Sequence, residues 1–147
     1  SYTGETIEGR TRLHCQVISA VREAVGPDFL VALRLGACDY QEGGSTQADA
    51  VAACKIFEAA GIDLLDISGG LCGYRGDGSK IPGYFGNESQ AIREAVSVPV
   101  ILTGGVRTGL AAETLLEEGK ADLIGVGRSV LKDSSWAKKA FVELGIE

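Results

Sequence analysis

The chain has 147 residues, of which 45% are hydrophobic, and it carries a formal net charge of −6. This size and balance are typical of one soluble domain, and the sequence lacks the roughly 20 consecutive apolar residues of a membrane span. The acidic balance argues against a nucleic-acid-binding surface, so an anionic ligand would need a local site. Because the chain begins at Ser1 and contains no methionine, we expect that it was cut from a longer protein or processed.

The cysteines are scattered along the sequence, at Cys15, Cys38, Cys54 and Cys72. A zinc or iron–sulfur site needs clustered thiolates, and the absence of CxxC spacing leads us to expect no metal site. Isolated cysteines with no signal peptide before them are typical of reduced thiols in a cytoplasmic protein, which is the localisation we predict.

Helical and strand patterns alternate along the chain, beginning with a helix whose apolar residues Leu13, Val17, Val21 and Ala24 share one face. Thr46 to Asp49 has the form of a capping box, and Asn87, Thr108 and Asp133 are predicted to cap later helices. The sequence predicts helices at 9–24, 46–60, 87–96, 108–118, a short one after 128, and 136–144. Strands are predicted at 30–35, 63–67, 99–102 and 122–126.

Four strand–helix units in succession predict an α/β fold with a parallel sheet covered by helices. A doubly wound sheet and half of a (βα)8 barrel both fit this pattern. A full barrel needs about 250 residues, so four βα units in 147 residues amount to about half of one.

Two apolar segments end in glycine and then meet an arginine: VILTGG ends with Gly104 and Gly105, and LIGVGR ends with Gly127 and Arg128. Ligands of parallel α/β folds gather at the carboxyl ends of the strands. Glycine permits positive φ and close approach of a ligand to the backbone, and arginine makes forked hydrogen bonds to phosphate. We therefore predict a phosphate site, with ordinary turns as the alternative, and expect Arg107 to be solvated.

Arg34 lies near the carboxyl end of the apolar run LVALRL, and strand alternation places it on the same face as Ala32. Asp66 occupies a similar late position in the next strand, DLLDIS, and an arginine on a sheet face needs such a partner. We expect an ion pair between Arg34 and Asp66. The same cation could face an electron-rich ligand.

Residues 9–44, 57–70, 99–108 and 117–140 together resemble the C-terminal half of old yellow enzymes, the FMN-dependent ene-reductases of the NADH:flavin oxidoreductase family. The opening YTGETIEGRTR is similar to a looser form of the family signature Y-G-G-S-x-x-N-R-x-R, with one extra residue and Gly9 where asparagine is common. The GG and GR turns occur in the family's order with the family's neighbours.

The resemblance implies a TIM-type (βα)8 barrel, of which residues 1–147 form a single partial domain, the C-terminal half with strands five to eight. It implies FMN as cofactor, NADH or NADPH as electron donor, and an activated alkene or similar small molecule as substrate. It implies contact between Arg34 and the flavin pyrimidine edge, where a cation stabilises the reduced flavin. The residues implied for the FMN phosphate are Gly104, Gly105, Gly127 and Arg128. The glycine-rich loop at 68–86, with Tyr74 and Tyr84, would be a lid near the site.

The family's substrate-binding histidine pair and its proton-donating tyrosine lie on earlier segments, so we assign no catalytic residue here. The only histidine, His14, is expected to be a structural or surface residue of the first helix. We expect this chain alone to be inactive. The alternatives are a non-catalytic half-barrel that self-associates or pairs with a missing N-terminal half through its open strand edges, and a different phosphate-binding barrel enzyme.

Overall fold

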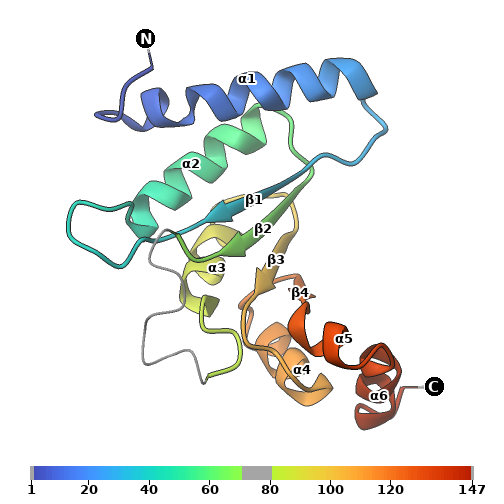
Figure 1. Ribbon diagram of the computed structural model, residues 1–147. Helices are drawn as coiled ribbons and strands as arrows, with labels where there is room; N and C mark the ends of the chain where they lie inside the picture. Colours follow the sequence, from blue (N-terminus) through green and yellow to red (C-terminus); the bar gives the residue numbers. More distant parts are fainter. Residues whose placement is uncertain (1, 71–80, 147) are drawn as a thin grey trace.

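The computed structural model describes residues 2–70 and 81–146 of the chain, which form an α/β structure (Figure 1). The described strands are β1 (Ala32–Gly36), β2 (Leu64–Ser68), β3 (Val100–Thr103) and β4 (Leu123–Gly125). The described helices are α1 (Ile7–Val25), α2 (Gln47–Ala59), α3 (Gly86–Arg93), α4 (Gly109–Glu117), α5 (Arg128–Lys132) and α6 (Trp136–Glu143).

The four described strands form one parallel sheet in the order β1-β2-β3-β4. The spatial order is the order of the chain, without the reversal that characterises a doubly wound sheet. β1 and β4 are the two edges, and within the described residues each has one neighbouring strand. The register aligns Arg34 with Asp66, Asp66 with Ile101, and Ile101 with Leu123 in a row across the sheet.

The two faces of the sheet differ in burial. One face packs against helices, and Leu65, Ile67, Val100 and Leu102 on this face have no exposed surface. Phe57 of α2 and Ile92 of α3 belong to the same core. The opposite face is more open, since the side chain of Arg34 is 53% exposed and Leu123 is 48% exposed. Among the described elements, helices therefore cover one face of the sheet only.

The capping residues predicted for α2 and α4 are confirmed. The Thr46 hydroxyl accepts a hydrogen bond from the Asp49 N–H, and the Asp49 carboxylate accepts one from the Thr46 N–H. At the start of α4, the Thr108 hydroxyl accepts from the Ala111 N–H at 3.2 Å. These side chains satisfy N–H groups that have no partner within the first helical turn.

Two predicted helix starts need correction. The prediction that Asn87 caps α3 is wrong, because the helix begins at Gly86 and Asn87 lies inside its first turn. The N-cap of α6 is Ser135 rather than Asp133. Asp133 contributes indirectly: its carboxylate accepts hydrogen bonds from the Ser135 N–H and hydroxyl, and it pairs with Lys139 at 2.6 Å.

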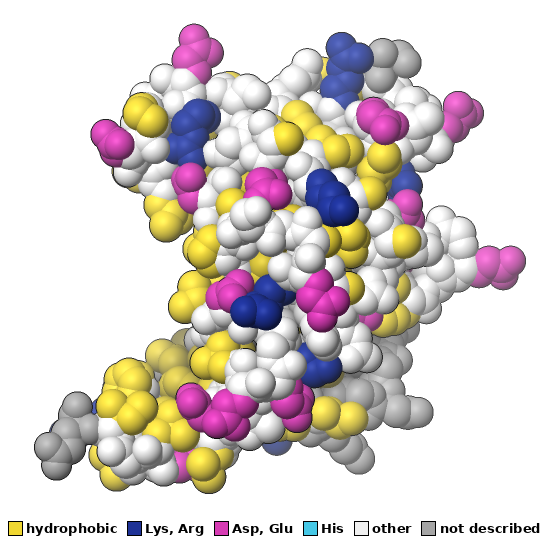
Figure 2. Space-filling model, turned by 180° about the vertical axis from the view of Figure 1, so that it is seen from behind, with side chains coloured by type: hydrophobic (Ala, Val, Ile, Leu, Met, Phe, Trp, Pro, Cys, Tyr) yellow, Lys and Arg dark blue, Asp and Glu magenta, His cyan; other side chains and the backbone are white. Residues whose placement is uncertain are grey.

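The apolar face of α1 is largely exposed: Leu13 is 57%, Val17 54% and Val21 39% accessible. The residues of α1 that are buried are Thr11 and Ile18. The helix as a whole packs against α2 (Figure 1). A second group of exposed apolar side chains lies at the C-terminal end of the molecule, where Figure 2 shows hydrophobic surface over α4 and α6; it includes Leu110, Phe141 and Val142. Both groups remain without cover in the described structure.

Within residues 2–70 and 81–146, no helix combines the length and the hydrophobicity needed to cross a lipid bilayer. The lid expected at 68–86 falls mostly on residues 71–80, so that expectation, together with Tyr74 and Cys72, lies outside the described residues.

Candidate functional site

The carboxyl ends of all four strands border one pocket of about 540 Å³. All five residues predicted from the sequence to bind the cofactor line this pocket, together with residues of β2, β3 and the loops that follow. The five are Arg34, Gly104, Gly105, Gly127 and Arg128. The fold therefore brings together residues that are up to 94 positions apart in the sequence (from 34 to 128).

The pocket is lined by positive charge. Its lining includes Arg34, Arg107, Arg128 and Lys132, and no aspartate or glutamate among the described residues. This contrasts with the net charge of −6 of the whole chain. Four cations line this concave surface, and one of them, Arg34, is paired with Asp66, which is not among the described lining residues. An excess of positive charge in the lining favours an anionic ligand.

The Gly104–Gly105 turn lies directly under the ring of Tyr84. Both glycines have positive φ, +149° and +69°, which L side chains rarely adopt. A β-carbon on either glycine would lie 2.8 Å from a ring carbon of Tyr84, too close for real contact. The turn needs glycine because of its backbone conformation and because an aromatic ring occupies the adjacent space, a reason that differs from the predicted approach of a ligand.

Gly127 is not constrained in this way. Its φ is −109°, and a β-carbon there would meet nothing within 4 Å. Gly127 is the N-cap of α5, which has only five residues and begins at Arg128. The macrodipole of so short a helix is small, so the positive charge at this side of the pocket comes mainly from the arginine side chain.

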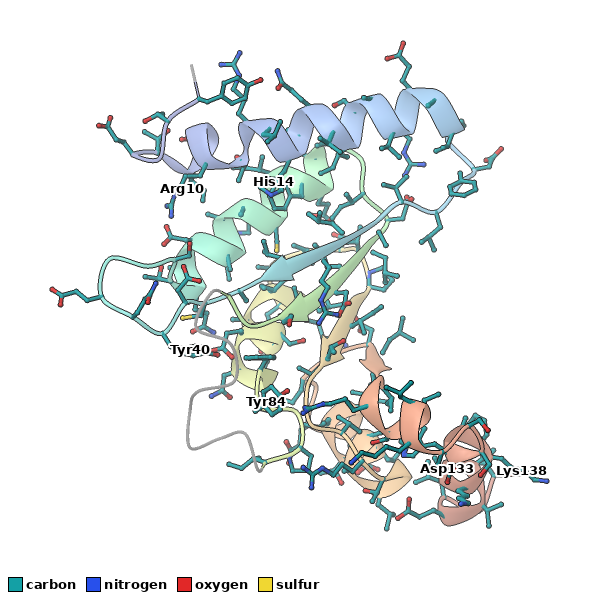
Figure 3. The ribbon with its side chains drawn as sticks, viewed as in Figure 1. Arg10, His14, Tyr40, Tyr84, Asp133 and Lys138 are labelled. Carbon is teal, nitrogen blue, oxygen red and sulfur yellow. The ribbon has the colours of Figure 1, made fainter. Side chains whose placement is uncertain are left out.

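Arg128 is held at the pocket by Tyr84: its Nη2 donates a hydrogen bond to the Tyr84 hydroxyl at 3.2 Å. Tyr84 and Arg128 are 44 residues apart in sequence, and no local pattern links them. Sequence reasoning named Tyr84 only as part of a lid and did not place it against the glycine turn. Figure 3 shows Tyr84 where the sheet meets the C-terminal helices.

The ion pair predicted between Arg34 and Asp66 is confirmed. Asp66 also accepts a hydrogen bond from the Thr103 hydroxyl at 2.7 Å, through its other carboxylate oxygen. The second terminal nitrogen of Arg34, Nη2, donates to the Ser68 hydroxyl at 3.0 Å. This network spans β1, β2 and β3 on the open face of the sheet. Thr103 and Ser68 were not singled out from the sequence, although strand alternation places Ser68 on the same face as Asp66.

Two further residues lie as expected. Arg107 is exposed at the rim of the pocket, while its backbone carbonyl accepts a hydrogen bond from the Trp136 indole N–H at 2.7 Å. His14 is exposed on α1, with its ring 5.4 Å from that of Phe57 and far from Tyr84 (Figure 3). In the part of the chain that the structure describes, no three His, Cys, Asp or Glu side chains gather as metal ligands.

Residues 1–146 match the model of the NADH:flavin oxidoreductase / NADH oxidase family. The chain belongs to this family. It is 37% identical to an NADPH dehydrogenase of Bacillus licheniformis, over 96% of this chain and 41% of that protein. It is 33% identical to a metal reductase of Desulforamulus reducens, over 93% of this chain and 21% of that protein. The chain thus spans between a fifth and two fifths of these relatives.

A solved structure of a 2-naphthoyl-CoA reductase in complex with 2-naphthoyl-CoA superposes on the chain with a TM-score of 0.86 and 26% identity, covering 99% of this chain and 23% of that one. Membership of the family implies FMN as cofactor and NADH or NADPH as electron donor. The pocket fits such a cofactor, because its cations match a phosphate and its volume is in the range of small-molecule sites.

Proposed function

We propose that the chain is the C-terminal half of a (βα)8 barrel in an FMN-dependent NAD(P)H oxidoreductase, and that it holds the phosphate of FMN. The observation that carries the proposal is the pocket at the carboxyl ends of the strands, which has four cations and no carboxylate in its described lining. Family membership adds the identity of the cofactor.

In this proposal Arg128 and the backbone of Gly104, Gly105 and Gly127 hold the phosphate group. The guanidinium supplies paired donors to phosphate oxygens, and backbone N–H groups of the two turns supply the other donors in this proposal. Arg34, fixed by Asp66, lies at the pyrimidine edge of the flavin and stabilises negative charge there. When bound, FMN supplies the hydride chemistry, accepting hydride from NAD(P)H and passing it to the acceptor.

Two features of the sheet support a half-barrel over a doubly wound sheet. The strands follow chain order without a reversal, and the described helices cover one face only. In a closed barrel the open face, with Arg34, Asp66 and Thr103, would be the interior, and the edges β1 and β4 would each gain a neighbour. The short coverage of relatives agrees with a missing half.

We further propose that the chain alone does not turn over substrate, since no substrate-binding or proton-donating residue of the family can be assigned in it. An activated alkene is the proposed acceptor, by resemblance to old yellow enzymes, and the cytoplasm is the proposed compartment. NADPH consumption with an enone by the isolated 147-residue chain would contradict the claim that it is inactive alone.

The decisive test is a titration with FMN and, in parallel, with riboflavin, which lacks the phosphate. We expect saturable quenching of flavin fluorescence with FMN, weaker binding of riboflavin, and loss of this difference in Arg128→Ala. Lys138→Ala, which removes a cation on α6 that is not part of the pocket lining, is the matched control. Equal affinity of the unmodified protein for FMN and riboflavin would contradict a phosphate site.

A second candidate concerns assembly. The two strand edges and the exposed apolar residues of α1 and α6 favour association with a partner, either the other half-barrel or a second copy. Light scattering during gel filtration, with an apolar dye as a probe of open surface, separates these cases. A monomer that does not bind the dye would rule out association.

A further inference from the structure

The Thr103 hydroxyl belongs to a row of polar contacts that crosses the open face of the sheet. It donates to Oδ1 of Asp66 at 2.7 Å, while Oδ2 of the same carboxylate pairs with Nη1 of Arg34. The three residues come from β3, β2 and β1, and both Thr103 and Arg34 line the pocket. One series of contacts therefore links the third strand to the cation on the first.

The orientation of the Asp66 carboxylate depends on its partners. The terminal torsion of an aspartate has no sharp preference of its own, so the contacts at its two oxygens determine how the carboxylate plane is turned. Thr103 holds one oxygen and Arg34 the other. Without the threonine hydroxyl, the carboxylate would rotate more widely, and the direction in which it presents Oδ2 to the guanidinium would be less well defined.

Arg34 needs this support because its side chain is 53% exposed. A long side chain of this kind loses considerable rotamer entropy when it is held in one place. Two contacts hold it: Nη1 pairs with Asp66, and Nη2 donates to the Ser68 hydroxyl at 3.0 Å. The position of the positive charge at the pocket therefore depends on Asp66 and, through Asp66, on Thr103.

The neighbouring strand β4 leaves space for the Thr103 hydroxyl. Gly125 is aligned with Thr103 in the parallel ladder, and a β-carbon at position 125 would lie 2.1 Å from the threonine hydroxyl oxygen. A larger residue at 125 would displace this hydroxyl. The glycine therefore preserves the geometry in which Thr103 reaches Asp66.

We propose that Thr103 is a positioning residue for flavin binding, which acts through Asp66 to hold the guanidinium of Arg34 at the flavin ring. The inference rests on the part of the proposed function that places the pyrimidine edge of the flavin at Arg34. Reduction of a flavin adds negative charge at that edge, and a cation held there stabilises the charge. Thr103 thereby favours the reduced form of the bound flavin, although its own hydroxyl is turned towards Asp66.

The test compares Thr103→Val and Thr103→Ser with the unmodified protein in titrations with FMN and with riboflavin. Valine keeps the branched shape and removes the hydroxyl, whereas serine keeps the hydroxyl. We expect Thr103→Val to lower both affinities by the same factor, about two- to fivefold, as for the loss of a partly exposed ion pair. The midpoint potential of the bound flavin should become more negative in Thr103→Val, and Thr103→Ser should restore both the affinity and the potential.

A double-mutant cycle separates a positioning role from direct contact with the ligand. In an Asp66→Ala background the hydroxyl has lost its acceptor, so the addition of Thr103→Val should lower the flavin affinity no further. Thr114→Val is the matched control, because Thr114 is exposed on α4 and its hydroxyl donates to the Leu110 carbonyl at 2.9 Å, outside the pocket. Thermal unfolding of each variant checks that the fold is retained.

The outcomes separate the inference from the function on which it rests. An equal loss of both affinities and a more negative potential in Thr103→Val, both restored by serine and absent in the Asp66→Ala background, support the inference. An unchanged affinity or potential in Thr103→Val, a loss that adds to that of Asp66→Ala, or a loss confined to FMN overturns it and leaves the proposed function in place. Failure of the unmodified protein to bind either flavin overturns both.

Discussion

Arg34 and Asp66 form an ion pair between directly aligned positions of β1 and β2, on the open face of the sheet. The aspartate thereby fixes a cation at the pocket, and it is itself fixed by the Thr103 hydroxyl. Because the side chain of Asp66 is 22% exposed and that of Arg34 53%, solvent screens the pair, and its main effect is to orient Arg34.

Replacement of Asp66 should therefore weaken the binding of the flavin, and the effect should be the same whether or not the ligand carries a phosphate. We expect Asp66→Asn to reduce the affinities for FMN and riboflavin by the same factor, about two- to fivefold, the usual range for a partly exposed pair. The same change at Asp133, which pairs with Lys139 away from the pocket, is the control. A loss confined to FMN would place Arg34 at the phosphate instead of the ring.

Alanine substitutions at two site glycines should have different effects. An alanine at position 105 would have to adopt a positive φ, and its β-carbon would meet the ring of Tyr84. We therefore expect Gly105→Ala to lower the free energy of unfolding by about 1–3 kcal/mol. Gly127→Ala meets open space at negative φ, and we expect a change within about 0.5 kcal/mol.

Urea unfolding measures both substitutions. A double-mutant cycle of Gly105→Ala with Tyr84→Ala then separates the ring clash from the backbone strain, since only the clash disappears when the ring is removed. Equal effects at positions 105 and 127 would contradict the conformational argument.

The start of α4 should depend on a residue of α6. The carboxylate of Glu143 accepts hydrogen bonds from the backbone N–H of Gly109 at 2.7 Å and of Leu110 at 3.4 Å. A negative charge at a helix N-terminus stabilises it, so we expect Glu143→Ala to lower stability by about 1 kcal/mol. Glu143→Gln should retain part of this, because its amide oxygen still accepts. Chemical denaturation measures the free energy of unfolding of both variants. If Glu143→Ala leaves it unchanged, the contact contributes nothing to stability.

Acid should weaken the start of α2. A hydrogen bond from Arg10, followed by those from Thr46, lowers the pKa of Asp49 from its ordinary value of 3.8 to about 2. A lowered folded-state pKa means that the stabilisation is present above pH 3.8 and is lost as the pH falls towards 2. We expect Asp49→Asn to be less stable than the unmodified protein at pH 5 and to approach it near pH 2. If the difference in stability between Asp49→Asn and the unmodified protein is the same at pH 5 and near pH 2, the ionisation of Asp49 does not stabilise the fold.

The helices, the strands and the residues around the pocket were predictable from local patterns, whereas the exposure of the apolar helix faces was not. The capping residues Thr46 and Thr108 act on N–H groups only three residues away. The pair Arg34–Asp66 follows from the similar late positions of the two residues in neighbouring strands. The apolar face of α1 with Leu13 and Val17 follows the helical period correctly, yet periodicity does not say what covers a face.

Contacts made over long loops escaped prediction for a physical reason. Tyr84 meets Arg128 only because the loop before α3 returns to the carboxyl ends of β3 and β4, and its path depends on the packing of Phe85. Glu143 reaches Gly109 because α6 packs on α4. No spacing within a segment encodes such contacts, since they depend on tertiary packing.

The ring of Tyr84 over the Gly104–Gly105 turn also limits how these positions can change together over evolution. While an aromatic side chain stays at position 84, any residue larger than glycine at 104 or 105 would meet it at 2.8 Å. A substitution at either glycine should therefore appear in related sequences mainly where position 84 has become small. Thr103 and Gly125 form a second such pair, since a β-carbon at 125 would lie 2.1 Å from the threonine hydroxyl. Both pairs should covary across the family.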